Sequence, residues 1–184
     1  MDKRIYLCLA HMSGKEMGFI QEAFDTNWVV PLGPNVNAFE QDLECFVGQD
    51  KKVVALSAGT AAVHLALLAC GVGQGDEVIV QSFTFCASSH PVTYLGATPV
   101  FVDSEVDTWN MDPVALEKAF EMYPQVKVVV TAHLYGTPGK VDEIKDICKK
   151  HGAVIVEDAA ESLGATYKGK MSGTIGDYGI YSFN

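Results

Sequence analysis

Residues 154–164 read VIVEDAAESLG, and this stretch decides the fold that the sequence predicts. A short run of β-branched residues leads directly into Glu157 and Asp158, and small residues follow. This order is typical of a buried parallel strand that ends at the carboxyl edge of a sheet, where α/β proteins bind their ligands. Asp158 is therefore a candidate site residue, because a buried carboxylate stays ionised only beside a cationic group. For a single aspartate, capping of the following turn is the competing interpretation.

The composition excludes several classes of protein. The 184 residues are 48% hydrophobic, which is enough for one substantial core, so we expect one domain or a part of a larger one. The net charge of 13 − 23 = −10 disfavours binding to nucleic acid or to an anionic membrane. Five scattered cysteines without a Cys-x-x-Cys pair argue against a disulfide framework and against a structural zinc. The apolar run 5–10 is too short for a signal sequence or a membrane span, so we expect a soluble cytoplasmic protein without a metal site.

Strands and helices alternate from residue 52 onward. Two helices precede this part: one opens with a capping box at Ser13 and Glu16 and reaches about residue 27, and one spans about 36–47. Helices alternating with buried strands predict a three-layer α/β/α fold with a mostly parallel sheet. The predicted strands are 53–56, 77–81, 98–102, 126–131, 153–156, 165–167 and 178–183, with a hairpin turn at 168–170, and the predicted helices are 61–70, 86–96, 112–122 and 141–151.

One predicted strand-to-helix junction is suited to binding an anion. Gly59, Thr60 and Ala61 follow the strand 53–56 and begin a helix, so their N–H groups and the helix dipole would face a negative charge. No Gly-Lys-Ser/Thr sequence follows, which excludes a nucleoside-triphosphate loop. The glycine-rich segment 71–76 is not a dinucleotide fingerprint, because it follows a helix and precedes a strand.

Three other strand ends carry candidate side chains. Phe85 follows the strand 77–81 and could stack on a planar ring, although an aromatic residue there is usually part of a core. His133 and Tyr135 lie just beyond the strand 126–131, and Asp158 lies just beyond the strand 153–156. Pyridoxal phosphate (PLP) fits this combination of an anion-binding helix N-terminus, an aromatic side chain, a His/Tyr pair and a carboxylate. Its ring nitrogen stays protonated beside a carboxylate.

Short motifs follow one another through the chain: NWVVPLGP at 27–34, GTAA at 59–62, QSFTF at 81–85, DTWNM at 107–111, LYG at 134–136, EDAAESLG at 157–164 and SFN at 182–184. With these motifs in this order, the sequence resembles the DegT/DnrJ/EryC1/StrS family of sugar-nucleotide aminotransferases over its whole length. The closest likeness is to members that aminate the 4-keto group of UDP-linked 4-keto-6-deoxy-N-acetylhexosamines for surface glycan precursors. This resemblance implies the large domain of a fold type I PLP-dependent transferase.

The resemblance also implies roles for individual residues around the cofactor. Thr60 and the backbone of Ala61, beside Gly59, would hold the phosphate together with Ser182. Phe85 would stack on the ring. Asp158 would pair with the ring nitrogen.

Glu161 would face the 3′ oxygen of the ring. Many relatives have Gln or His there, so we expect the Glu161 carboxyl to be protonated or hydrogen-bonded. His133 is a catalytic candidate, and Pro31, Leu32 and Tyr135 are candidates for contact with the nucleotide-sugar substrate. Glutamate as amino donor and a homodimer follow from the same resemblance.

The Schiff-base lysine of the family lies a few residues after the Ser-Phe-Asn motif, and none of the lysines present stands at that position. Residues 1–184 are therefore expected to be the N-terminal part of the PLP-binding large domain and to be inactive alone. The rest of that domain and the C-terminal small domain are absent from the chain. Two alternatives remain open: a PLP-dependent sugar 3-dehydratase with histidine in place of the lysine, and a non-catalytic truncated paralogue. A nicotinamide oxidoreductase is a more remote third.

Overall fold

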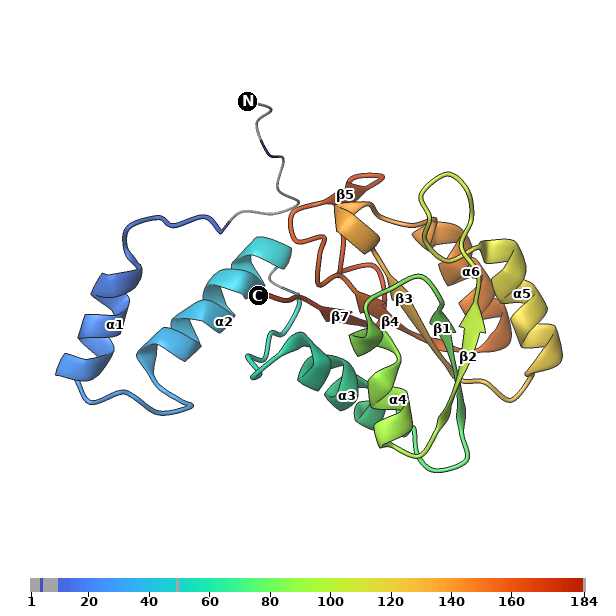
Figure 1. Ribbon diagram of the computed structural model, residues 1–184, viewed down its shortest axis with the longest axis horizontal. Coiled ribbons are helices and arrows are strands. Elements are labelled where there is room, and N and C mark those ends of the chain that lie inside the picture. Colours follow the sequence, from blue (N-terminus) through green and yellow to red (C-terminus); the bar gives the residue numbers. More distant parts are fainter. Residues whose placement is uncertain (1–3, 5–9, 49, 184) are drawn as a thin grey trace. The chain divides into compact units, whose positions relative to one another are not determined.

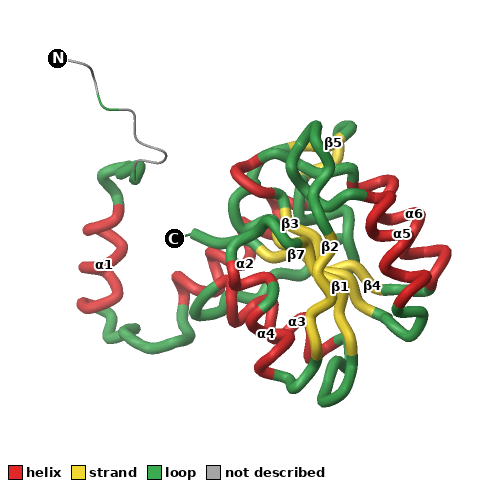
Figure 2. The backbone as a smooth tube through the Cα atoms, turned by 45° about the vertical axis from the view of Figure 1, so that its right-hand side comes forward, coloured by secondary structure: helices red, strands yellow, loops and turns green. Residues whose placement is uncertain are grey.

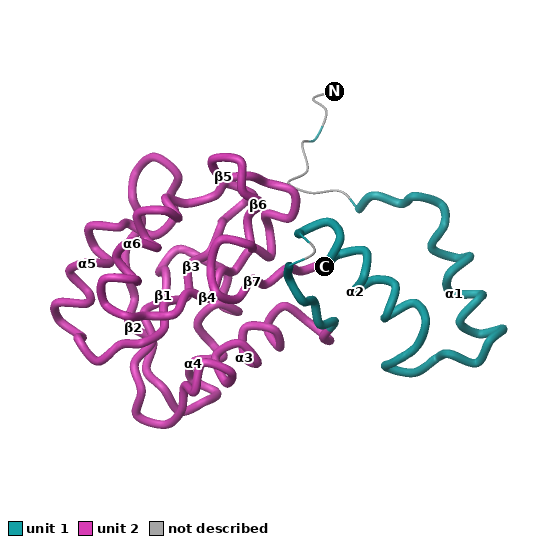
Figure 3. The backbone as a smooth tube through the Cα atoms, turned by 180° about the vertical axis from the view of Figure 1, so that it is seen from behind, with its two compact units in different colours: residues 1–55 teal, residues 56–184 magenta. Residues whose placement is uncertain are grey.

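The computed structural model describes residues 4, 10–48 and 50–183. The chain divides into two compact units, Met1–Ala55 and Leu56–Asn184 (Figure 3). No helix in the described ranges is both long and apolar enough to cross a membrane.

The first unit contains two helices, α1 (Glu16–Asp25) and α2 (Pro34–Val47). The Glu16 carboxylate accepts the N–H of Ser13 at 2.6 Å, as the predicted capping box requires. However, the Ser13 hydroxyl accepts from Lys15, so the helix begins only at Glu16. Helix α2 begins two residues earlier than predicted, because proline is favoured in a first helical turn.

The predicted strand at 53–56 is wrong. Within the described residues, this segment forms no strand pairing. The N–H of Val53 donates to the Glu44 carboxylate at 3.2 Å, and the N–H of Ala55 donates to the Glu40 carboxylate at 2.7 Å. Side chains of α2 therefore satisfy backbone donors that a neighbouring strand would otherwise use.

The second unit is built on five parallel strands (Figure 1). Strand β3 (Val128–Ala132) is the middle strand and β4 (Val154–Asp158) lies beside it, and Ala132 is paired with Asp158 where they end. The bounds predicted for 77–81 and 98–102 are confirmed without a shift. The order across the sheet is β2 (Thr98–Val102), β1 (Glu77–Gln81), β3 (Val128–Ala132), β4 (Val154–Asp158) and β7 (Tyr178–Ile180).

Helices cover both faces of this sheet (Figure 2), which confirms the predicted three-layer α/β/α fold. Helices α3 (Gly59–Ala69) and α4 (His90–Tyr94) cover the face that contains Val156. Helices α5 (Pro113–Met122) and α6 (Val141–His151) cover the face that contains Ile155. The two faces alternate along each strand, so Asp158 lies on the α3 side and Glu157 on the α6 side.

Shorter elements connect the layers. The predicted helix 86–96 is divided into a 3₁₀ turn, η1 (Cys86–Ser88), and α4, where Pro91 lies in the first turn. A second 3₁₀ turn, η2 (Leu134–Gly136), follows β3. The predicted turn at 168–170 joins β5 (Thr166–Tyr167) to β6 (Lys170–Met171) in an antiparallel pair. Strand β7 instead joins the main sheet beside β4 and is shorter than predicted.

Candidate functional site

Asp158 is the last residue of β4 and is buried at the carboxyl edge of the sheet. Its Oδ2 accepts the hydroxyl of Ser88 at 2.6 Å, and its Oδ1 accepts the N–H of Ala160 at 3.3 Å. Burial raises the pKa of Asp158, and the hydrogen bond from Ser88 opposes this shift most strongly. A further cationic donor at Oδ1 would stabilise the ionised carboxylate.

The N-terminus of α3 offers backbone donors on the same face of the sheet. Ala58 is extended, and no side chain caps the helix there. The N–H groups of Gly59, Thr60 and Ala61 therefore keep the capacity to bind an anion, and the helix dipole favours one. Ser182 is their neighbour, because a Cβ added at Gly59 would lie 3.4 Å from the Cβ of Ser182. The structure thus brings together all four residues predicted to hold the phosphate.

Phe85 is 69% exposed and so is not a core residue. It immediately precedes η1, and its carbonyl accepts the N–H of Ser88 at 3.1 Å. The same turn thus carries the predicted ring-stacking residue and the serine that donates to Asp158. An exposed aromatic ring that is linked through Ser88 to a buried carboxylate could stack on a planar ligand.

Glu161 and Tyr135 contact one another beyond the strand ends. Tyr135 has a left-handed backbone (φ 52°), and its N–H donates to Oε2 of Glu161. The hydrogen bond expected for Glu161 is therefore present, with a backbone donor. The Tyr135 side chain is exposed.

His133 is buried, and both of its ring nitrogens have partners. Nδ1 accepts the N–H of Gly139 at 3.2 Å, so the ring proton is on Nε2, which donates to Oε1 of Glu157 at 2.8 Å. This arrangement leaves no ring nitrogen for proton transfer to a ligand. The geometry favours a positioning role for His133 over the catalytic role that the sequence suggested.

Sequence reasoning did not identify Glu157 as important, although it adjoins Asp158. Its carboxylate is fully buried and accepts from His133 and from the N–H groups of Gly173, Ile175 and Gly176. Burial would raise the pKa of Glu157, but the donation from His133 and these backbone donors outweighs it and lowers the pKa. Strand alternation alone could have separated Glu157 from Asp158 onto opposite faces.

Sequence reasoning also missed a buried amide pair that holds the loops around the site. The Gln81 side-chain carbonyl accepts the N–H of Met111 at 3.1 Å and that of Ala132 at 3.2 Å. Its amide donates to Asn110 at 3.2 Å, and Asn110 in turn accepts the N–H of Leu134 at 3.0 Å. The loops after β1, β2 and β3 are thereby fixed together, with both amides fully buried.

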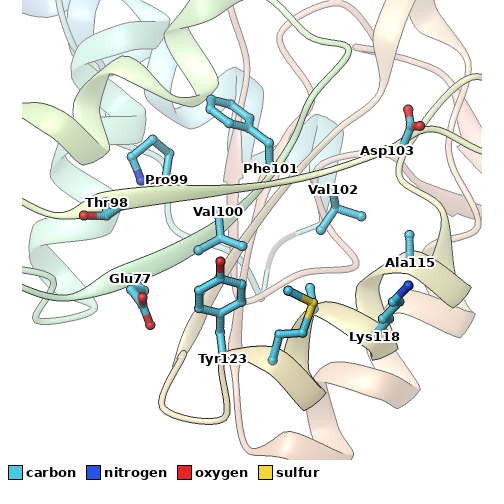
Figure 4. Close-up of a pocket in the computed structure, with 12 residues that line it drawn as sticks. Glu77, Thr98, Pro99, Val100, Phe101, Val102, Asp103, Ala115, Lys118 and Tyr123 are labelled. Carbon is cyan, nitrogen blue, oxygen red and sulfur yellow. The ribbon is translucent and has the colours of Figure 1, made fainter.

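Pro31 and Leu32 lie in the exposed loop between α1 and α2 of the first unit. A separate cavity of about 400 Å³ lies between edge strand β2 and helix α5 (Figure 4), and Val100, Lys118 and Tyr123 contribute to its walls. None of the site residues predicted from the sequence lines it. Within the described part of the chain, no group of three or more His, Cys, Asp or Glu side chains could hold a metal ion.

Comparisons with known proteins identify relatives of the chain over its whole length. EpsN of Bacillus subtilis, whose name describes a pyridoxal phosphate-dependent aminotransferase, is 53% identical over 100% of this chain and 48% of its own length. GDP-perosamine synthase of Caulobacter vibrioides is 42% identical over 98% of this chain and 48% of its own length. The chain spans about half the length of these relatives.

Solved structures match the fold closely. The apo-form of Spr1654 from Streptococcus pneumoniae, described as a sugar aminotransferase, has a TM-score of 0.90 at 33% identity, over 98% of this chain and 48% of that one. Its PLP-form has a TM-score of 0.84 at 32% identity, over 95% of this chain and 47% of that one. The sheet is thus that of the large domain of fold type I sugar aminotransferases. The model of the DegT/DnrJ/EryC1/StrS aminotransferase family matches residues 11–184, and the chain belongs to this family.

Proposed function

We propose that residues 1–184 are the N-terminal part of the PLP-binding large domain of an enzyme that transaminates a nucleotide-linked 4-keto-6-deoxy sugar. Glutamate is the proposed amino donor, and the product is a precursor of a surface polysaccharide. The observation that carries the proposal is the position of Asp158, buried at the end of β4 on the same face as the N-terminus of α3. The names of EpsN and the perosamine synthases support the chemistry.

The residues present fit pyridoxal phosphate. The uncapped first turn of α3 and the neighbouring Ser182 fit a phosphate, because the turn supplies backbone N–H donors and Ser182 supplies a hydroxyl donor. Asp158 has acceptor capacity left at Oδ1 for a protonated ring nitrogen. Phe85 supplies an exposed ring face. When bound, pyridoxal phosphate supplies a protonated ring that takes up negative charge from the reacting carbon.

The residues of this chain would then bind and orient. Asp158 would hold the proton on the ring nitrogen, and the amides of Thr60 and Ala61 would bind the phosphate with Ser182. Glu161, positioned by its bond to the Tyr135 N–H, would face the 3′ oxygen of the ring.

His133 would act indirectly, because it orders Glu157 and the loop that leads to Gly139. Tyr135, Pro31 and Leu32 are the proposed substrate contacts. A homodimer is the proposed assembly.

We propose a UDP-linked N-acetylhexosamine as the sugar substrate. A GDP-linked sugar is the second candidate, because the relatives in Caulobacter vibrioides and Escherichia coli O157:H7, 42% and 38% identical, are named GDP-perosamine synthases. Competition between the two 4-keto-6-deoxy substrates, with the amino sugar measured by mass spectrometry, decides between them.

The test of the proposal is Asp158→Asn in the full-length protein. The variant loses the charge on the ring-nitrogen partner, so kcat with glutamate and the keto sugar is expected to fall by about 100-fold or more. Asp146→Asn, at an exposed position on α6, is the matched control and should retain normal kcat. Normal turnover by Asp158→Asn would refute the role of Asp158. If the wild-type protein removes water from the sugar without transferring nitrogen, the protein is a dehydratase and not an aminotransferase.

A further inference from the structure

A chain of hydroxyl groups points at Asp158 from the turn that carries Phe85. Ser88 ends this turn, its side chain is fully buried, and its Oγ lies 2.6 Å from Oδ2 of Asp158. Because an ionised carboxylate only accepts, the single proton of the Ser88 hydroxyl is committed to Asp158. Thr84 Oγ1 lies 2.9 Å from Ser88 Oγ and must therefore donate to it. The direction of the chain is Thr84 to Ser88 to Asp158.

This chain determines which carboxylate oxygen is left for a ligand. Oδ2 of Asp158 is bound by a short, charge-assisted hydrogen bond, whereas the partner of Oδ1 among the described residues is the Ala160 N–H, at the longer distance of 3.3 Å. The carboxylate plane is thus fixed at one oxygen and open at the other. A carboxyl group without the Ser88 donor would be free to rotate and would protonate more readily in its buried position.

The same serine joins two of the proposed cofactor contacts. The N–H of Ser88 donates to the Phe85 carbonyl at 3.1 Å, while its hydroxyl donates to Asp158, which lies 70 positions away in the sequence. One residue therefore sets the position of the ring-stacking turn relative to the carboxylate. A flat ligand can contact Phe85 and Asp158 together only if these two side chains are correctly spaced. Because Ser88 sets that spacing, both proposed contacts depend on it.

We propose that Ser88 is a positioning residue that holds Asp158 ionised and oriented toward the ring nitrogen of pyridoxal phosphate, with Thr84 completing its hydrogen bonding. This inference rests on the proposed function and extends it to a residue outside the cofactor contacts. Ser88 has no direct contact with the ligand in this proposal. It acts through Asp158 on the affinity for the cofactor and on the protonation of the cofactor ring.

The experiment compares full-length wild type with Ser88→Ala, Ser88→Thr and Thr84→Val by titrating each apo-protein with pyridoxal phosphate at about pH 6 and about pH 8. Loss of a hydrogen bond to a charged group predicts an affinity about 10- to 100-fold lower for Ser88→Ala. The loss should be larger at the lower pH, because Asp158 then protonates more easily. Ser88→Thr keeps the hydroxyl and should bind within about 3-fold of wild type, and Thr84→Val should show an intermediate loss.

Ser89→Ala is the matched control, because the hydroxyl of Ser89 donates to the carbonyl of Cys86 and not to Asp158. It should bind the cofactor like wild type at both pH values. Equal affinity and an equal pH profile for Ser88→Ala and wild type would overturn the proposal. If Ser88→Ala does not fold, a pH-independent, wild-type affinity of Thr84→Val would overturn it instead. Failure of wild type itself to bind pyridoxal phosphate would refute the proposed function, which is a distinguishable result.

Discussion

At the scale of single residues, Glu157 shows how a buried charge holds a binding edge together. Its carboxylate receives hydrogen bonds from His133, after β3, and from three backbone N–H groups of the segment 173–176, before β7. A buried carboxylate is costly unless such donors surround it. Because Asp158 follows it directly in β4, the position of the proposed ring-nitrogen partner depends on this neighbour.

Glu157→Gln in the full-length protein is therefore expected to lower the free energy of unfolding by about 2–4 kcal/mol, since its new NH₂ group would face N–H donors. The pKa of Glu157 lies below its ordinary value of 4.5 in the folded state. Its contribution to stability is thus fully present above that value and is lost as the pH falls through the folded pKa. Urea denaturation should show the difference from wild type shrinking below pH 4.5.

The control for this measurement is Glu121→Gln, which changes an exposed carboxylate of α5. A surface change of this kind should alter stability by no more than about 0.5 kcal/mol. If Glu157→Gln were as stable as this control across the pH range, the four hydrogen bonds would not stabilise the fold.

At the scale of elements, β7 depends on close approach between two glycines. A Cβ at Gly179 would collide with the carbonyl oxygen of Gly173, which is backbone and cannot move aside like a flexible side chain. Gly173 itself has φ 82°, a conformation that favours glycine. The segment 173–176 can therefore fold against β7 only because neither position carries a side chain.

Gly179→Ala is expected to destabilise the full-length protein by about 2–3 kcal/mol, as overpacking does elsewhere. Its affinity for pyridoxal phosphate should fall as well, because β7 leads to Ser182. The thermal midpoint and cofactor titration measure the two effects. Gly73→Ala is the control, since a Cβ there meets nothing within 4 Å. A Gly179→Ala protein that matched this control in both measurements would contradict the close approach.

At the scale of the whole molecule, α1 carries an apolar surface suited to the proposed homodimer. No residue of α1 is buried, and Met17, Ile20 and Phe24 are 70%, 48% and 65% exposed. These three share one helical face by their spacing. If the homodimer proposed above forms, such a face is the expected contact of α1 with the second copy of the protein.

The double variant Ile20→Glu with Phe24→Glu is expected to weaken dimerisation of the full-length protein by more than about 100-fold, because two apolar side chains are lost on each subunit. Sedimentation analysis across a concentration series measures the change. Gly18→Glu adds a negative charge to α1 in open space and should leave the dimer intact. A double variant that remained dimeric would exclude α1 from the interface.

Local patterning predicted much of the fold. The bounds of β1, β2 and α6 agree with the sequence. The predicted helix 112–122 is α5, and Asp112, whose carboxylate accepts the N–H of Val114 at 2.9 Å, is its N-cap. Each depends on neighbours a few positions away: alternating apolar residues, a turn residue, or a cap. The predicted strand 153–156 corresponds to β4, which begins one residue later and continues through Glu157 and Asp158 to the sheet edge.

Only the tertiary structure decided which polar groups meet. Residues 53–56 resemble a strand, yet carboxylates of α2 satisfy their backbone. His133 has the sequence position of a site residue, yet both of its ring nitrogens form hydrogen bonds within the protein, to Gly139 and Glu157. Ser88 carries no signal in its own segment, because its partner Asp158 lies 70 positions away. Periodicity reports which face of an element is apolar, whereas a hydrogen bond between distant segments depends on how the strands are ordered in the sheet.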